Sequence, residues 1–98
     1  MGKEEIWEFW LYIAGQTPKS ILALENIKKY SKEHLSAKYI IEVIDLLKSP
    51  QLAEQDQIFA IPTLVRKAPK SLRKIIGDLS NKEKVLTGLN IRPIAVAD

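Results

Sequence analysis

The sequence contains no cysteine among its 98 residues. This absence excludes disulfide bonds, metal sites built on thiolates and thiol–disulfide exchange. It is compatible with a reducing compartment, and we expect a cytoplasmic protein. Histidine is scarce as well, because His34 is the only one and has Glu33 beside it. Metal sites and catalytic triads need several converging groups, so we expect His34 to be a solvated surface residue and no metal or cofactor to be bound.

Long apolar runs are also missing. The apolar segment near the N-terminus covers only about eight positions, which is too short for a membrane span or a signal peptide. The net charge of +3 gives weak attraction to polyanions, so we expect neither nucleic acid nor a membrane as partner. With 46% hydrophobic and 28% charged residues, the chain is expected to form one globular domain over 1–98, with residues 91–98 loosely held.

The first half of the chain is strongly patterned. Residues 6–14 are apolar on both faces of an extended chain, which predicts a central strand. Thr17 and Pro18 are typical of a helix start, and the spacing predicts a helix over 18–32. Its apolar face would consist of Ile21, Leu24, Ile27 and Tyr30. A second strand over 38–45 would then lie parallel to the first, through a right-handed crossover.

The second half predicts a short helix, a hairpin and a closing helix. Ser49 as cap and Pro50 in the first turn indicate a helix over 51–59. Residues 61–66 and 72–76 would form a β-hairpin around a turn at Pro69. Ser80 and Glu83 match a capping box at the start of the last helix. The order β-α-β-α-β-β-α is the thioredoxin-like arrangement of an α/β protein, and similarity to that fold implies a cis peptide bond before Pro62.

Three further groups of residues are candidate sites. Trp7 and Trp10 are expected to be core or interface residues rather than base-stacking ones. Asp45 and Asp78 have no second group for acid–base chemistry. A basic cluster is expected to form a solvated hairpin face or to meet an acidic protein partner, and it consists of Arg66, Lys67, Lys70, Arg73 and Lys74. No catalytic set emerges, so we expect the protein not to be an enzyme.

The chain resembles the KaiB family, the small partners of the KaiC ATPase in bacterial clock systems. The similarity runs from about residue 11 to residue 89. It rests on Leu11-Tyr12-Ile13-Ala14-Gly15, Thr17-Pro18, Val43-Ile44-Asp45, Leu47-Lys48, Pro50-Gln51-Leu52-Ala53-Glu54, Asp56, Pro62-Thr63-Leu64 and the run from Ile75 to Leu86.

The resemblance implies a non-enzymatic adaptor that binds a KaiC-like hexameric ATPase. Such chains occupy two folds, one thioredoxin-like and one, typically tetrameric, in which the half after about Leu47 is rearranged. We expect the thioredoxin-like fold, because the local cap and turn signals agree with it. The partner-binding residues implied are Lys48, Pro50, Gln51, Leu52, Asp56 and Arg73. Residues implied in fold switching are Pro62, Pro69, Gly88 and Asn90.

Departures from the family pattern keep alternatives open. Glu42 and Gln57 stand where clock members often carry lysine, which bears on recognition of a KaiA-type partner. A stress-related variant acting with a KaiC-like ATPase outside a true oscillator is the first alternative. The others are a thioredoxin-like or stress protein not acting through such an ATPase, and the sensory domain of a larger kinase. A KaiA-type protein or a histidine kinase stays open as a further partner. A homo-oligomer, dimer or tetramer, is also compatible with the sequence.

Overall fold

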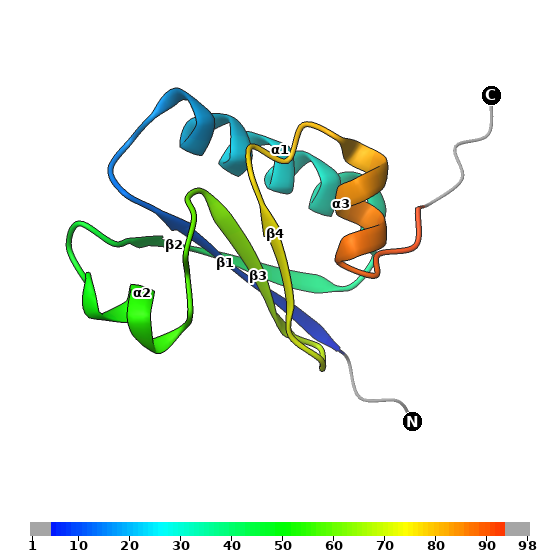
Figure 1. Ribbon diagram of the computed structural model, residues 1–98. Helices are drawn as coiled ribbons and strands as arrows, with labels where there is room; N and C mark the ends of the chain where they lie inside the picture. The colour runs from blue at the N-terminus through cyan, green and yellow to red at the C-terminus, as the bar shows by residue number, and fades with distance from the viewer. Residues whose placement is uncertain (1–4, 94–98) are drawn as a thin grey trace.

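The computed structural model describes residues 5–93, and Figure 1 shows how its helices and strands are arranged. Along the chain these elements are β1 (Ile6–Ile13), α1 (Pro18–His34), β2 (Lys38–Asp45), α2 (Gln51–Gln55), β3 (Thr63–Ala68), β4 (Arg73–Ile76) and α3 (Lys82–Gly88). The predicted order β-α-β-α-β-β-α is therefore confirmed.

The strands form one sheet with the order β2-β1-β3-β4. β1 pairs in parallel with β2 and antiparallel with β3, and β3 continues into β4 as an antiparallel hairpin. β1 lies inside the sheet because its side chains are apolar on both faces, so each face can be buried. The predicted central strand, parallel pair and hairpin are all confirmed.

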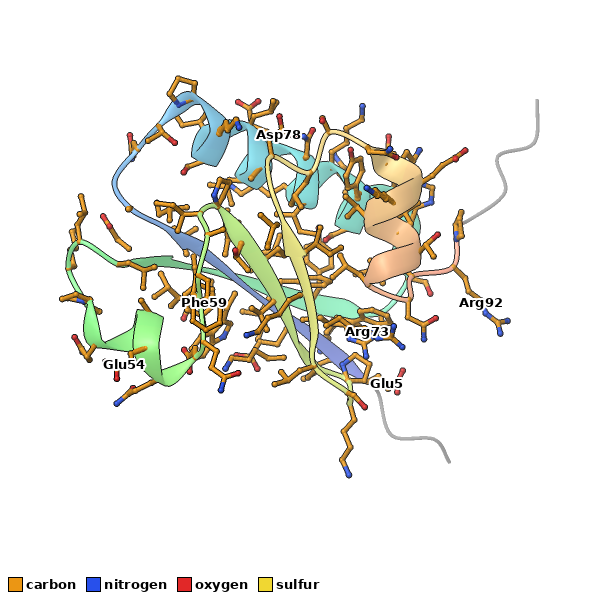
Figure 2. The ribbon with its side chains drawn as sticks, viewed as in Figure 1. Glu5, Glu54, Phe59, Arg73, Asp78 and Arg92 are labelled. Atoms are coloured by element: carbon orange, nitrogen blue, oxygen red, sulfur yellow. The ribbon has the colours of Figure 1, made fainter. Side chains whose placement is uncertain are left out.

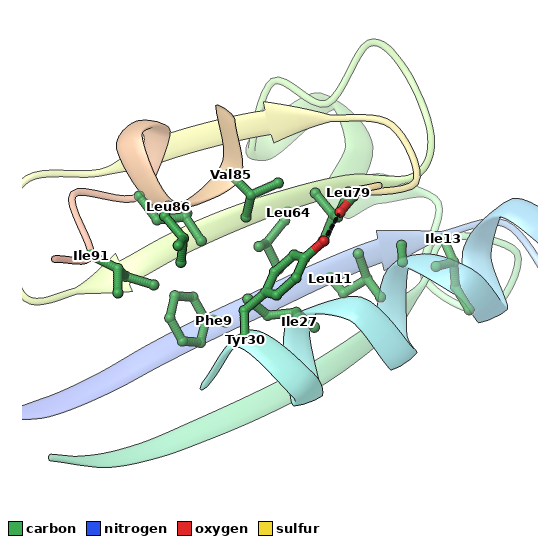
Figure 3. Packing of buried hydrophobic residues seen from close by; sticks show 12 residues of the cluster. Phe9, Leu11, Ile13, Ile27, Tyr30, Leu64, Leu79, Val85, Leu86 and Ile91 are labelled. Atoms are coloured by element: carbon green, nitrogen blue, oxygen red, sulfur yellow. Dashed lines mark hydrogen bonds between the residues drawn. The ribbon is translucent and has the colours of Figure 1, made fainter. Parts of the chain in front are cut away.

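The two faces of the sheet carry cores of different size. Helices α1 and α3 cover one face, and the larger cluster of buried side chains lies between them and the sheet (Figures 1 and 3). Phe9 and Leu11 of β1 contribute to it together with Ile27 of α1 and Leu86 of α3. The other face holds a smaller buried cluster of Tyr12, Ile58 and Val65, beside α2. The segment carrying α2 is therefore held by far less apolar burial than α1 or α3.

Tyr30 joins α1 to the connection between β4 and α3. Its hydroxyl donates a hydrogen bond of 2.7 Å to the carbonyl oxygen of Leu79, drawn as a dashed line in Figure 3. Burial raises the pKa of Tyr30, and the negative charges of Asp78 and Glu33 raise it further. The buried hydroxyl thus stays protonated and has an acceptor, as a buried polar group requires.

Helix α1 begins as predicted but buries a different face. The Thr17 hydroxyl oxygen accepts a hydrogen bond of 3.1 Å from the Ser20 amide, and Pro18 occupies the first turn. The prediction that Ile21 faces the core is wrong, because this side chain is 47% exposed, and Leu24 is only half-buried. The buried residues are Ser20, Ala23, Ile27, Tyr30, Ser31 and His34. Ser20, Ala23 and Ser31 are small, and small residues on the buried face let a helix lie close to a sheet.

His34 is buried, so its prediction as a solvated residue is wrong. Helix α1 continues to residue 34 instead of ending near 32, and this brings the imidazole under the sheet end beside Trp7 and Ile91. The His34 Nε2 atom lies 3.9 Å from the Glu33 carboxylate. A helix two residues longer than expected therefore makes this histidine part of the interior and not a surface group.

The starts of the other two helices also differ from their predictions. The N-cap of α2 is Pro50, and the Ser49 side chain makes no capping bond. That helix ends at Gln55 rather than 59, and Gln57 follows with a left-handed φ of +55°. In α3 the cap is Asn81, whose side chain accepts from the Lys84 amide at 3.1 Å, so the predicted capping box at Ser80 is wrong by one residue. Asparagine and serine are nearly equal caps, and local sequence does not choose between neighbours.

Ile91, the first residue of the segment that was expected to be loosely held, is fixed by packing and by a hydrogen bond. Ile91 is buried in the main cluster, and its amide donates a hydrogen bond of 2.8 Å to the Leu86 carbonyl. The prediction of a loosely held tail is wrong for this residue. Residues 94–98 lie outside the described residues.

Candidate partner-binding surface

Asp45, at the end of β2, organises the two loops that lead to the candidate surface. Its Oδ1 accepts hydrogen bonds from the amides of Gly15 and Leu47, both at 3.0 Å. These bonds, the one from Gly15 first, hold the pKa of Asp45 below its usual range. Gly15 has a φ of +70°, and an added Cβ would lie 3.1 Å from the Leu47 side chain. Asp45 has no second group for acid–base chemistry, and its role is structural: it links the β1–α1 connection to the β2–α2 connection.

A groove of about 410 Å³ lies where these connections meet. Its apolar lining includes Ile13 and Val43, and Lys48 and Leu52 line it from the side of α2. Lys48, Pro50 and Gln51 are exposed, and Leu52 is half-buried. The structure thus brings together the predicted residues from the β2–α2 connection and α2.

Helix α2 is attached to the sheet by two side chains. The Tyr12 hydroxyl donates a hydrogen bond of 2.6 Å to the Asp56 carboxylate, and Tyr12 is buried. Burial, the Asp56 hydrogen bond and the Asp56 charge, in that order, raise the pKa of Tyr12 far above its usual value. The Lys74 ammonium donates to the carbonyl oxygens of Asp56 and Gln57 at 2.9 and 3.0 Å. Asp56, predicted to bind a partner, therefore also fixes the position of α2.

Exposed apolar side chains flank α2 in the chain, and sequence reasoning missed them. Phe59 is 89% exposed and Leu47 is 70% exposed. The predicted helix over 51–59 includes Phe59, and in such a helix its side chain would be expected on the buried apolar face. The nearby Pro62 is the available signal, since it forces an extended chain and leaves room only for a short helix. Large exposed apolar side chains on the two segments that flank one helix are typical of an interaction surface.

Arg73 does not join the other predicted binding residues. It pairs in register with Arg66, so its side chain lies on the helix-covered face of the sheet. Figure 2 shows Phe59 and Glu54 at the end of the sheet that carries α2, and Arg73 near Glu5, away from them. The geometry therefore leaves five predicted residues together, which are Lys48, Pro50, Gln51, Leu52 and Asp56.

The basic cluster is divided between the two faces of the sheet. Arg66 is 2% exposed, and its guanidinium donates hydrogen bonds of 2.8 Å each to the carbonyl oxygens of Leu89 and Ser71. Burial lowers the pKa of Arg66, as does Arg73 beside it. The Lys67 ammonium lies 4.2 Å from the ring centre of Trp10, on the other face. The prediction of one solvated basic face is therefore wrong, because side chains of a strand alternate between faces.

The residues implied in fold switching are dispersed. The peptide bond before Pro62 is cis, as predicted, and so is the bond before Pro69. Gly88 ends α3, where an added Cβ would lie 2.8 Å from the Ile75 side chain. Asn90 has a left-handed φ of +58°. All four lie after α2, in the half of the chain that the resemblance marks as variable.

Residues 5–93 contain no group of three or more His, Cys, Asp or Glu side chains that could hold a metal ion. Within the same residues, no helix is long and apolar enough to cross a membrane.

Comparison with known proteins gives consistent results. The sequence matches the KaiB domain over residues 10–91. The circadian clock oscillator protein KaiB of Microcystis aeruginosa is 53% identical over 81 residues, which cover 83% of this chain and 78% of that protein. The KaiB of Thermosynechococcus vestitus is 51% identical, covering 83% and 75%.

Solved structures with a similar fold include two at 20% identity. The N-terminal domain of SasA from Synechococcus elongatus has a TM-score of 0.74, covering 92% of this chain and 89% of that one. Mitochondrial thioredoxin 3 from Saccharomyces cerevisiae has a TM-score of 0.67, covering 86% and 76%. These likenesses establish a thioredoxin-like fold. With that fold and the match over residues 10–91, the chain belongs to the KaiB family of circadian clock oscillator proteins.

Proposed function

We propose that this chain is a non-enzymatic adaptor that docks on a KaiC-like hexameric ATPase. The docking surface is formed by Lys48, Pro50, Gln51, Leu52 and Asp56, together with the exposed Phe59. The observation that carries the proposal is that these residues lie in α2 and the segments on either side of it, where Lys48 and Leu52 line a groove with apolar lining. Membership of a clock family makes a clock ATPase the partner class to test.

The composition of the surface suits reversible docking. Phe59 offers a large apolar side chain that is 89% exposed, and Leu52 offers a half-buried one. Lys48 and Gln51 of the same segment add exposed polar groups. An apolar centre with a polar rim is the common anatomy of protein interfaces. The Tyr12–Asp56 hydrogen bond of 2.6 Å positions α2 before binding, which reduces the ordering cost of association.

The same proposal includes action by binding, a cytoplasmic location and exchange with a second fold. Thiol–disulfide exchange is excluded because the sequence has no cysteine, so the chain acts by binding. A cytoplasmic location follows from a partner of this class. Exchange with a second fold would involve the half after α2, which contains Pro62, Pro69, Gly88 and Asn90. Slow complex formation is the expected sign of such exchange, since the competent fold must form before the partner can bind.

The test is co-elution of the chain with the KaiC-like ATPase of its own organism, in ATP and in ADP, over several hours. The variant Leu52→Glu should abolish the complex while keeping a native circular dichroism spectrum. Leu22→Glu is the matched control, because Leu22 is 39% exposed on α1, away from the docking surface. Wild-type chain that never co-elutes would contradict the proposal and point to a partner outside this ATPase class. Equal binding by both variants would refute the docking surface at α2 and point to another surface for the same ATPase.

A further inference from the structure

Two parts of the chain that are distant in sequence carry the most exposed large apolar side chains of the described residues. Leu47 and Phe59 stand on either side of α2, and Leu72 and Ile76 belong to the β3–β4 hairpin. The exposed fractions of the hairpin pair are 59% and 67%. Such side chains mark an interaction surface when they lie together in one patch.

Leu72 and Ile76 face the side of the sheet that carries α2. Ile75 packs against the main buried cluster between the sheet and the helices α1 and α3, and alternation therefore turns Lys74 and Ile76 to the opposite side. The Lys74 ammonium reaches that side, since it donates to two carbonyl oxygens at the end of α2. Leu72 lines a groove of about 190 Å³ whose lining also includes residues 55–57. The hairpin and the α2 segment therefore border one groove.

Ile76 also borders the segment that carries Phe59. It pairs in register with Thr63, and the Thr63 hydroxyl donates a hydrogen bond of 2.6 Å to the Ala60 carbonyl oxygen. Ala60 stands between Phe59 and Ile61, which are both exposed. The apolar side chains of residues 59–61 and of β4 thus adjoin each other, although they are far apart in the sequence.

We propose that the docking surface at α2 continues across this hairpin, where Leu72 and Ile76 contact an apolar segment of the same ATPase. The inference rests on the proposed function and extends its surface. A stable interface takes roughly 20–30 residues from each partner, which is more than residues 46–61 provide. The hairpin supplies further area, because it borders α2 along the groove and exposes apolar side chains on the same side. The Lys74 hydrogen bonds keep the two parts in a fixed arrangement, which lowers the ordering cost of binding both.

Helix α1 offers no equivalent continuation of the surface. Ile21 and Leu22 are exposed on this helix, but α1 covers the opposite face of the sheet (Figure 1). A partner seated on α2 and the hairpin therefore does not reach them. Ile21 is the matched control for Ile76, because both are isoleucines with exposed side chains.

Thiol alkylation maps the contact directly, because the chain has no cysteine of its own. Ile76→Cys and Ile21→Cys each place one thiol at an exposed position, the first on β4 and the second on α1. In the complex with the ATPase, iodoacetamide should modify position 76 at least about tenfold more slowly than in the free chain, because an interface core excludes solvent. Position 21 should react at an unchanged rate, and mass spectrometry of this chain measures both. A thiol at position 76 that is no better protected than the one at position 21 would overturn the inference.

Binding affinity provides a second test. Ile76→Glu and Leu72→Glu should each weaken the complex by about tenfold or more, since a carboxylate would be buried against an apolar segment. Ile21→Glu should change the affinity by less than about twofold, and all three variants should keep a native circular dichroism spectrum. If Leu52→Glu abolishes the complex while Ile76→Glu and Leu72→Glu bind normally, the hairpin is not part of the interface and the surface at α2 still stands. A wild-type chain that forms no complex would overturn both proposals.

Discussion

The hydrogen bond between Tyr12 and Asp56 makes a quantitative prediction about how α2 is held. The Tyr12 hydroxyl is buried and donates to the carboxylate at 2.6 Å. Tyr12→Phe keeps the ring in the smaller buried cluster and removes only the hydrogen-bond donor. The half-buried carboxylate of Asp56 then loses this partner. We expect a loss of about 1–3 kcal/mol in the free energy of unfolding, the usual cost of a missing partner for such a group.

Urea denaturation followed by circular dichroism measures this loss. The expected change is a lower midpoint with an unaltered slope, and the melting temperature should fall by about 4–8 °C for each kcal/mol. Tyr39→Phe is the matched control, since Tyr39 is exposed on β2 and no described hydrogen bond involves its hydroxyl. Its stability should change by less than about 0.5 kcal/mol. Equal midpoints for Tyr12→Phe and the wild-type chain would refute the reasoning, because the bond would then contribute nothing net.

Three further predictions follow from single contacts. The pKa of Tyr12 is raised above its usual 10.0, so near and above pH 10 only the unfolded state ionises. The contribution of Tyr12 to the free energy of unfolding should therefore be complete below pH 10 and fall as the pH rises past it. In urea titrations at alkaline pH, Tyr12→Phe should show a shallower fall than the wild-type chain. Gly88→Ala should destabilise the fold by about 1–3 kcal/mol, because its Cβ would lie 2.8 Å from Ile75; an unchanged melting curve would show that Ile75 moves aside without cost. Asn81→Ala should lower the free energy of unfolding by about 1 kcal/mol, measured by thermal unfolding, while Ser80→Ala should change it little. The reverse order would show that Ser80 is the cap of α3.

Much of the architecture could be predicted because it is encoded locally. The two-sided apolar pattern of residues 6–14 identified the central strand, and Thr17 with Pro18 identified the start of α1. Errors arose where two neighbouring positions were chemically equivalent, as for Ser80 and Asn81. They also arose where a helix could end at several places, as for α2, because helix length depends on tertiary packing more than on propensity.

The candidate site was predictable only in part, because successive side chains of a strand point to opposite faces of the sheet. Lys48 to Leu52 could be grouped from sequence because they are adjacent. Arg66 and Arg73 looked like members of one basic cluster with Lys67 and Lys74, but alternation placed them on the opposite face of the sheet. The exposure of Phe59 depended on the early end of α2, and the only local sign of that end was Pro62, which favours an extended chain before it.

By itself the sequence determined the order of elements, the family and the absence of thiol chemistry, because periodicity, motif spacing and composition are properties of the chain alone. Tertiary structure alone decided the burial of His34 and Arg66, the attachment of α2 through Tyr12, and the apolar surface that β4 forms beside α2. These features depend on which surfaces meet across distant parts of the chain. The free energies of packing and hydrogen bonding depend on how far a side chain is buried and how close its hydrogen-bond partner lies. Both are defined only once the sheet and helices have assembled.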